Sequence, residues 1–83
     1  MKHSDICRET LDILHDALPM GLPEDVIQRH LKARLRVEPS KAAFDDALHD
    51  LKQRGFISSM EPEFDGDPAR WHLTEAGEVK QRR

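Results

Sequence analysis

The chain has 83 residues, of which 37% are hydrophobic and 35% charged, and this suits one small soluble domain over residues 1–83. No apolar run approaches the roughly 18 consecutive residues that a membrane-spanning helix requires, so we expect no membrane contact. The formal net charge of −3 excludes a surface that is basic overall, and any binding to nucleic acid must then rest on local clusters of cations.

The first residues lack the apolar stretch of a secretory signal, and the chain has a single cysteine, Cys7. One cysteine cannot form an internal disulfide, which is typical of proteins in a reducing compartment. These two features predict a cytoplasmic location.

A first helix is predicted over residues 4–18, with Ser4 as its N-cap. The residue before a proline is disfavoured in helical geometry, so the helix is expected to end before Pro19. Its apolar residues recur at helical spacing and form one stripe. The stripe consists of Ile6, Thr10, Ile13, Leu14 and Ala17, widened by Leu11 and Leu18.

A short strand is expected at residues 20–22, and a second helix is predicted over residues 23–35 with Pro23 in its first turn. Glu24 and Asp25 suit the positive end of that helix. A turn over residues 36–39 should follow. The residues predicted to face inward are Val26, Ile27, Leu31 and Leu35.

A third helix is predicted over residues 40–54, with Ser40 as its N-cap. Gly55 should stop it, because glycine adopts the left-handed backbone conformation at little steric cost. The apolar residues lie three and four positions apart and therefore share one face. They are Phe44, Ala47, Leu48 and Leu51.

A hairpin is predicted next, with strands over residues 56–60 and 70–73 and a turn at Asp65-Gly66. Prolines within the connection cannot donate to a strand ladder, so pairing should stay near the base of the hairpin. The prolines are Pro62 and Pro68.

The C-terminal part begins with Trp71, whose ring is expected to face the helices as a core residue. Thr74 is a suitable cap for a short final helix, in which Ala76 and Val79 supply apolar side chains. The last three residues, Gln81, Arg82 and Arg83, should fray, as chain ends commonly do.

The predicted elements from residue 40 onward follow the order of a recognition helix and its wing, which is a helix, a glycine stop, a strand, a turn and a second strand. Residues 47–57 carry the pattern Ala-Leu-x-x-Leu-x-x-Arg-Gly-Phe-Ile, and residues 71–77 read Trp-His-Leu-Thr-Glu-Ala-Gly. The chain thus resembles the winged helix-turn-helix superfamily, and within it the small bacterial transcription regulators. The resemblance covers nearly the whole chain. It implies an α+β, mainly helical fold with three helices, a short β-hairpin wing and a short C-terminal helix.

The resemblance further implies a non-enzymatic module that binds double-stranded DNA, with the helix at residues 40–54 in the major groove. Arginines and lysines near the end of the second helix could hold phosphates, since several lie three or four positions apart. The predicted nucleic-acid-binding residues are Lys41, Ala42, Asp45 and His49 toward the bases, Arg29, Lys32, Arg34 and Arg36 toward phosphates, and Ser40 and Arg70 beside them.

The acidic residues favour an alternative hypothesis. Matching the sequence to the family pattern puts Asp45 and Asp46 on the recognition surface, where phosphates would repel them. A winged helix that binds a basic protein partner would use these carboxylates instead. The basic cluster also has a plainer interpretation, as a solvated helix face partly paired with acids. A homodimer would suit so small a domain. The wing tip adds Glu61, Glu63, Asp65 and Asp67 to the acidic set.

The sequence contains few residue patterns that would indicate a metal site or a catalytic site. No two of the five histidines lie four positions apart, and the single cysteine has none of the spacings of a zinc site. Cys7 shows no activating partner in the sequence, and no glycine-rich phosphate loop is present. We therefore expect no metal, no cofactor and no catalytic residue.

Overall fold

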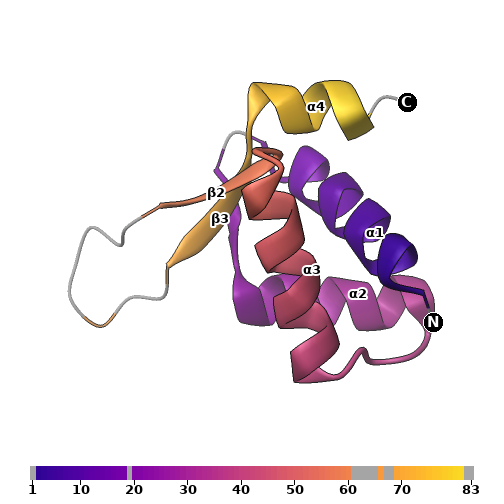
Figure 1. Ribbon diagram of the computed structural model, residues 1–83. Helices are drawn as coiled ribbons and strands as arrows, with labels where there is room; N and C mark the ends of the chain where they lie inside the picture. Colours follow the sequence, from indigo (N-terminus) through magenta and orange to yellow (C-terminus); the bar gives the residue numbers. More distant parts are fainter. Residues whose placement is uncertain (1, 19, 61–65, 67–68, 82–83) are drawn as a thin grey trace.

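The computed structural model describes residues 2–18, 20–60, 66 and 69–81. Within these residues it contains four helices and three strands, arranged as the mainly helical α+β fold that the sequence predicts. Figure 1 shows a helical body with a hairpin projecting from one side and the last helix lying across one end. The elements are α1 (His3–Asp16), β1 (Leu22–Pro23), α2 (Glu24–Leu35), α3 (Lys41–Gln53), β2 (Ile57–Met60), β3 (Arg70–Leu73) and α4 (Glu75–Gln81).

The core lies where α1 packs against α2, α3, α4 and β3. The predicted inward residues of α3 are all buried, which confirms its apolar face. Full burial of a large apolar side chain contributes about 1.5–3 kcal/mol relative to exposure. Among the described residues, the core has twelve buried apolar side chains, and all but Ala47 are of this large kind. Among the described helices, none combines the length and apolar character that crossing a membrane would require.

The sheet has the strand order β1-β3-β2, and both pairings are antiparallel. Ile57 lies opposite Leu73, and both side chains are buried against the helices. The predicted strands at residues 56–60 and 70–73 are therefore confirmed to within one residue. The short strand expected at residues 20–22 is also present, but it is confined to Leu22 and Pro23, so it begins two residues later and ends one residue later than predicted.

Side-chain caps connect the ends of neighbouring elements. The Ser40 hydroxyl accepts a hydrogen bond from the Ala43 backbone N–H at 3.1 Å, which confirms the predicted cap of α3. Gly55 follows α3 with φ +77°, the left-handed conformation predicted for it. The Thr74 hydroxyl accepts from the Gly77 N–H at 3.1 Å and donates to the Gly55 carbonyl at 2.6 Å, so one side chain joins the stop after α3 to the start of α4.

Two predictions about helix starts are wrong. Ser4 is not the N-cap of α1, because the helix begins at His3 and the Lys2 carbonyl accepts the first backbone bonds. No side chain caps this end. Pro23 precedes α2 as its N-cap residue instead of standing in its first turn, because it pairs with β3.

The prediction that Trp71 is a core residue is also wrong. Its ring is only partly buried and packs against the edge of the core, while its indole N–H donates to Glu24 at 3.2 Å.

The first helix, predicted to run to Leu18, ends two residues earlier, at Asp16. Gln81, which the sequence predicts to fray, is instead the last residue of α4, where its side chain donates to Asp12 at 2.8 Å. The acidic wing tip and both hairpin prolines also lie outside the described residues; Gly66 is described, with φ +93°.

Gly77, in α4, lies against the backbone of Phe56, the residue before β2, and a substitution there tests this contact. A Cβ at this position would lie 2.1 Å from the Phe56 carbonyl oxygen. Replacing an ordinary helix glycine with alanine stabilises a protein by about 1 kcal/mol. We expect Gly77→Ala to do the opposite and to lower the free energy of unfolding by about 1–3 kcal/mol in a urea titration, because the backbone must shift to admit the methyl group.

The exposed neighbour Ala76 supplies the control. Ala76→Ser should change the free energy of unfolding by no more than about 0.5 kcal/mol. A Gly77→Ala variant more stable than the wild type would contradict the close contact between α4 and the residue preceding β2.

Candidate nucleic-acid interface

The outward face of α3 is polar and open to solvent. Positions three, four and seven apart share one face of a helix, and Ala42, Asp45, Asp46 and His49 follow this spacing opposite the buried stripe. All four side chains are exposed. Lys41 lies 4.0 Å from Asp45, but its side chain is 81% exposed, so this pair leaves the ammonium group accessible.

The base of the hairpin adjoins α3 (Figure 1). The Lys52 ammonium group, near the end of α3, lies 5.9 Å from the centre of the Trp71 ring on β3, within range of a cation–π interaction. Arg70, the first residue of β3, is exposed, and its guanidinium donates to the Gly21 carbonyl at 3.5 Å. Two cations thus stand where α3 meets the hairpin.

Arg34 does not join the other cations of α2. Its guanidinium donates to Asp12, to Asp16 at 2.9 Å and to Glu9 at 3.5 Å, all on α1. The hydrogen bond from Arg34 is the main reason why the pKa of Asp12 lies below its usual range, and the pKa of Arg34 is raised in return. Arg34 therefore bridges α2 to α1, and three carboxylates already occupy the donors that a phosphate would need.

The remaining basic residues of this cluster are accessible. Arg29 pairs with Asp25 at 3.2 Å, with both side chains largely exposed. Lys32 has no ion pair among the described residues and shares the outer side of α2 with Arg29. Arg36 is also exposed and ends α2 with φ 59°, a left-handed conformation that is uncommon outside glycine. The predicted cluster is thus divided, with Arg34 turned to α1 and the others turned to solvent.

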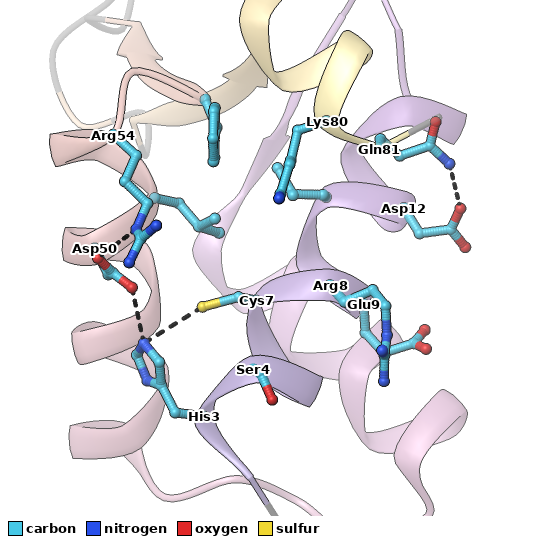
Figure 2. A pocket seen from close by; sticks show the side chains of 13 residues that line it. His3, Ser4, Cys7, Arg8, Glu9, Asp12, Asp50, Arg54, Lys80 and Gln81 are labelled. Atoms are coloured by element: carbon cyan, nitrogen blue, oxygen red, sulfur yellow. Dashed lines mark hydrogen bonds and ion pairs between the residues drawn. The ribbon is translucent and has the colours of Figure 1, made fainter. Parts of the chain in front are cut away.

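A second feature lies on the other side of α3. An open pocket of about 710 Å³ separates α1 from the end of α3 and from α4. Figure 2 shows His3 and Cys7 pointing into it from α1 and Asp50 and Arg54 from α3. The His3 Nε2 atom lies 3.0 Å from the nearer Asp50 oxygen and 3.5 Å from the Cys7 sulfur.

The electrostatics of this pocket follow from the same contacts. The hydrogen bond from His3 and then that from Arg54 lower the pKa of Asp50. Burial raises the pKa of the Cys7 thiol, as does the nearby Asp50 charge, while Arg54 acts in the opposite direction. Asp50 is 43 positions or more from the other two residues, so spacing along the chain does not reveal this group. The one sequence signal is His3 and Cys7, four positions apart on one helix.

Comparisons with known proteins agree on the fold. No protein-family model and no curated protein sequence matches this chain. A PadR-like transcription factor from Bacteroides fragilis is similar in structure, with a TM-score of 0.77 and 21% sequence identity over 96% of this chain and 76% of that one. A protein of Thermoplasma acidophilum described as a transcriptional regulator gives a TM-score of 0.73 and 22% identity over 96% and 74%. The chain has the winged helix-turn-helix fold.

The Arg34 bridge predicts how stability depends on pH. The pKa of Asp12 is lower in the folded chain than in the unfolded one, so the pairing stabilises the fold above the ordinary aspartate pKa of about 4 and is lost as the pH falls below it. Arg34→Gln should lower the free energy of unfolding at pH 7 by about 1 kcal/mol, a modest value because solvent screens these partly exposed carboxylates. Urea titrations at several pH values should show this difference shrinking toward pH 2.

Arg8→Gln is the matched control, since Asp5 is the one ion-pair partner of Arg8 within the described part of the chain and the Arg8 side chain is 74% exposed. That substitution should change the free energy of unfolding by less than about 0.5 kcal/mol at any pH. Equal pH profiles for Arg34→Gln and the wild type would show that the bridge is not formed in solution.

Proposed function

We propose that this chain is a small DNA-binding module of the transcription-regulator type, with α3 as its recognition helix. The proposal rests on the exposed face of α3. Ser40 caps the start of this helix, its apolar face is buried in the core, and its opposite face is open to solvent. Among the described residues, no hydrogen bond or ion pair ties Ala42, Asp46 or His49 to another element. A rigid helix with an unoccupied polar face is what entry into a major groove requires.

The cations around this face support the same proposal. Lys41 at the start of α3, Lys52 near its end and Arg70 at the base of the hairpin are candidates for phosphate contacts. The exposed N-terminus of α3, capped by Ser40, adds the positive end of the helix dipole. Arg29, Lys32 and Arg36 would extend contact from α2. Affinity should be modest and strongly dependent on salt, because so few phosphates can be neutralised.

Asp45 and Asp46 support a second candidate function. Both are exposed in the middle of the outward face of α3, where they would stand close to DNA phosphates. A basic protein partner would complement them, and electrostatic attraction would then steer association. The surface is the same in both hypotheses, and only the sign of the partner's charge differs.

Salt titration of binding to a random DNA duplex, followed by fluorescence anisotropy, tests the first proposal. We expect binding at low salt that weakens steeply as salt is added. Lys52→Ala should weaken binding and reduce the slope of log K against log salt by about 0.9, the value for one lost phosphate contact. Lys80→Ala, on α4, removes the same charge away from α3 and should leave the slope unchanged.

Absence of duplex binding at low salt would contradict the DNA-binding proposal. Equal effects of Lys52→Ala and Lys80→Ala would instead show that the duplex does not contact the surface between α3 and the hairpin.

A double substitution separates the two candidate functions. Asp45→Asn with Asp46→Asn removes two negative charges and keeps side chains of nearly the same size. If α3 meets DNA, the duplex should bind at least about threefold more tightly at low salt, because two repulsions with phosphates are lost. Glu75→Gln with Glu78→Gln, on α4, makes the same charge change elsewhere and is the control. No gain over that control would count against α3 as the recognition helix and favour the basic protein partner.

A further inference from the structure

Three side chains with metal-binding atoms converge where α1 meets α3. His3 and Cys7 lie one turn apart on α1, and Asp50 approaches them from α3 (Figure 2). The His3 nitrogen, the Cys7 sulfur and an Asp50 oxygen all lie within 4.8 Å of one another. Residues 47 positions apart in the sequence thus present one nitrogen, one sulfur and one oxygen to the same point.

Two of the three spacings are close to those of tetrahedral coordination. With metal–ligand bonds of about 2.0–2.3 Å, the ligand atoms of a tetrahedral zinc site lie roughly 3.3–3.6 Å apart. The observed nitrogen–sulfur distance is 3.5 Å and the nitrogen–oxygen distance is 3.0 Å, while the sulfur and the oxygen lie within 4.8 Å of each other. A single ion could therefore reach all three atoms after side-chain rotations that bring them to tetrahedral spacing.

A single proton on His3 cannot link all three groups by hydrogen bonds. A protonated His3 Nε2 donates to Asp50 and leaves the Cys7 thiol without an acceptor, whereas an unprotonated Nε2 accepts from Cys7 and faces the carboxylate lone pairs. A cation in the middle would serve all three atoms at once. The binding of a metal would release the thiol proton of Cys7, because the thiolate is the form that ligates.

Arg54 holds the carboxylate of Asp50 in position. Its Nε donates to one oxygen of Asp50 at 3.0 Å, while the other oxygen of that carboxylate faces His3. Such outer contacts hold a ligating group in position at many metal sites. The open pocket beside the cluster leaves room for a water molecule as a fourth ligand.

We propose that His3, Cys7 and Asp50 bind a divalent transition-metal ion of the zinc class. The mixed nitrogen, sulfur and oxygen donors suit Zn²⁺ and Co²⁺ and do not suit Mg²⁺ or Ca²⁺, which prefer all-oxygen sites. The ion would join the first turn of α1 to the second half of α3 and so stabilise the contact between these helices. At about 100° per residue, Asp50 lies roughly 80–100° around α3 from Ala42 and His49, and metal binding at this site requires no DNA.

Titration of the intact chain with Co²⁺ tests the proposal, because Co²⁺ substitutes for Zn²⁺ and absorbs light. We expect one Co²⁺ per chain, with a thiolate-to-cobalt charge-transfer band and the intense visible bands of tetrahedral geometry. The charge-transfer band reports on Cys7 alone, since the chain has no other cysteine. Zn²⁺ should displace Co²⁺ and raise the melting temperature of the wild type.

Three variants assign the ligands. Cys7→Ser should abolish the charge-transfer band, and His3→Gln and Asp50→Asn should each weaken Co²⁺ binding by at least about tenfold. His49→Gln removes an exposed histidine on the outward face of α3 and should bind Co²⁺ as the wild type does. Circular dichroism of each variant without metal would show that its helices form.

Several outcomes would overturn the site. They are Co²⁺ binding without a charge-transfer band, binding that His49→Gln weakens as much as His3→Gln, or a complex in which one ion joins two chains through Cys7. The assay contains no DNA, so its failure would leave the proposed function untouched, and a failure of duplex binding would not affect the metal site.

Discussion

The fold depends on α1 being enclosed on several sides. This helix packs against α2, α3, α4 and β3, and its buried residues include both Leu14, which has no exposed surface, and Thr10. The Thr10 hydroxyl donates to the Ile6 carbonyl one turn earlier, so burial leaves no unsatisfied polar group there. Because α2 and α3 both rest on α1, its position determines how α3 is presented to solvent.

The flanks of α1 carry two further connections. On one side, Glu9, Asp12 and Asp16 receive Arg34 from α2. On another, His3 and Cys7 meet Asp50 from α3. The helix is therefore held to its neighbours by polar contacts at its margins as well as by the apolar core, and one of these margins has the donor atoms of a metal site.

Internal pairing also decides which charges remain for a partner. The chain has a net charge of −3, and the carboxylates of α1 pair with Arg34. Lys32, Lys52 and Arg70 remain accessible, and Asp45 and Asp46 are exposed as well. In the proposed function, the balance of these few groups, more than the fold, would decide between a nucleic acid and a basic protein, since one fold can serve many functions.

The sequence by itself determined the local structure. The buried faces of α3 and of the hairpin strands follow from residue spacing, and the caps at Ser40 and Thr74 and the stop at Gly55 follow from turn chemistry, which acts over a few neighbouring residues. Only the tertiary structure decided the partners of Arg34, the partial burial of Trp71 and the meeting of His3 and Cys7 with Asp50. These contacts join residues on different elements, and they depend on the angles and offsets at which helices pack, which the spacing within any one helix does not encode.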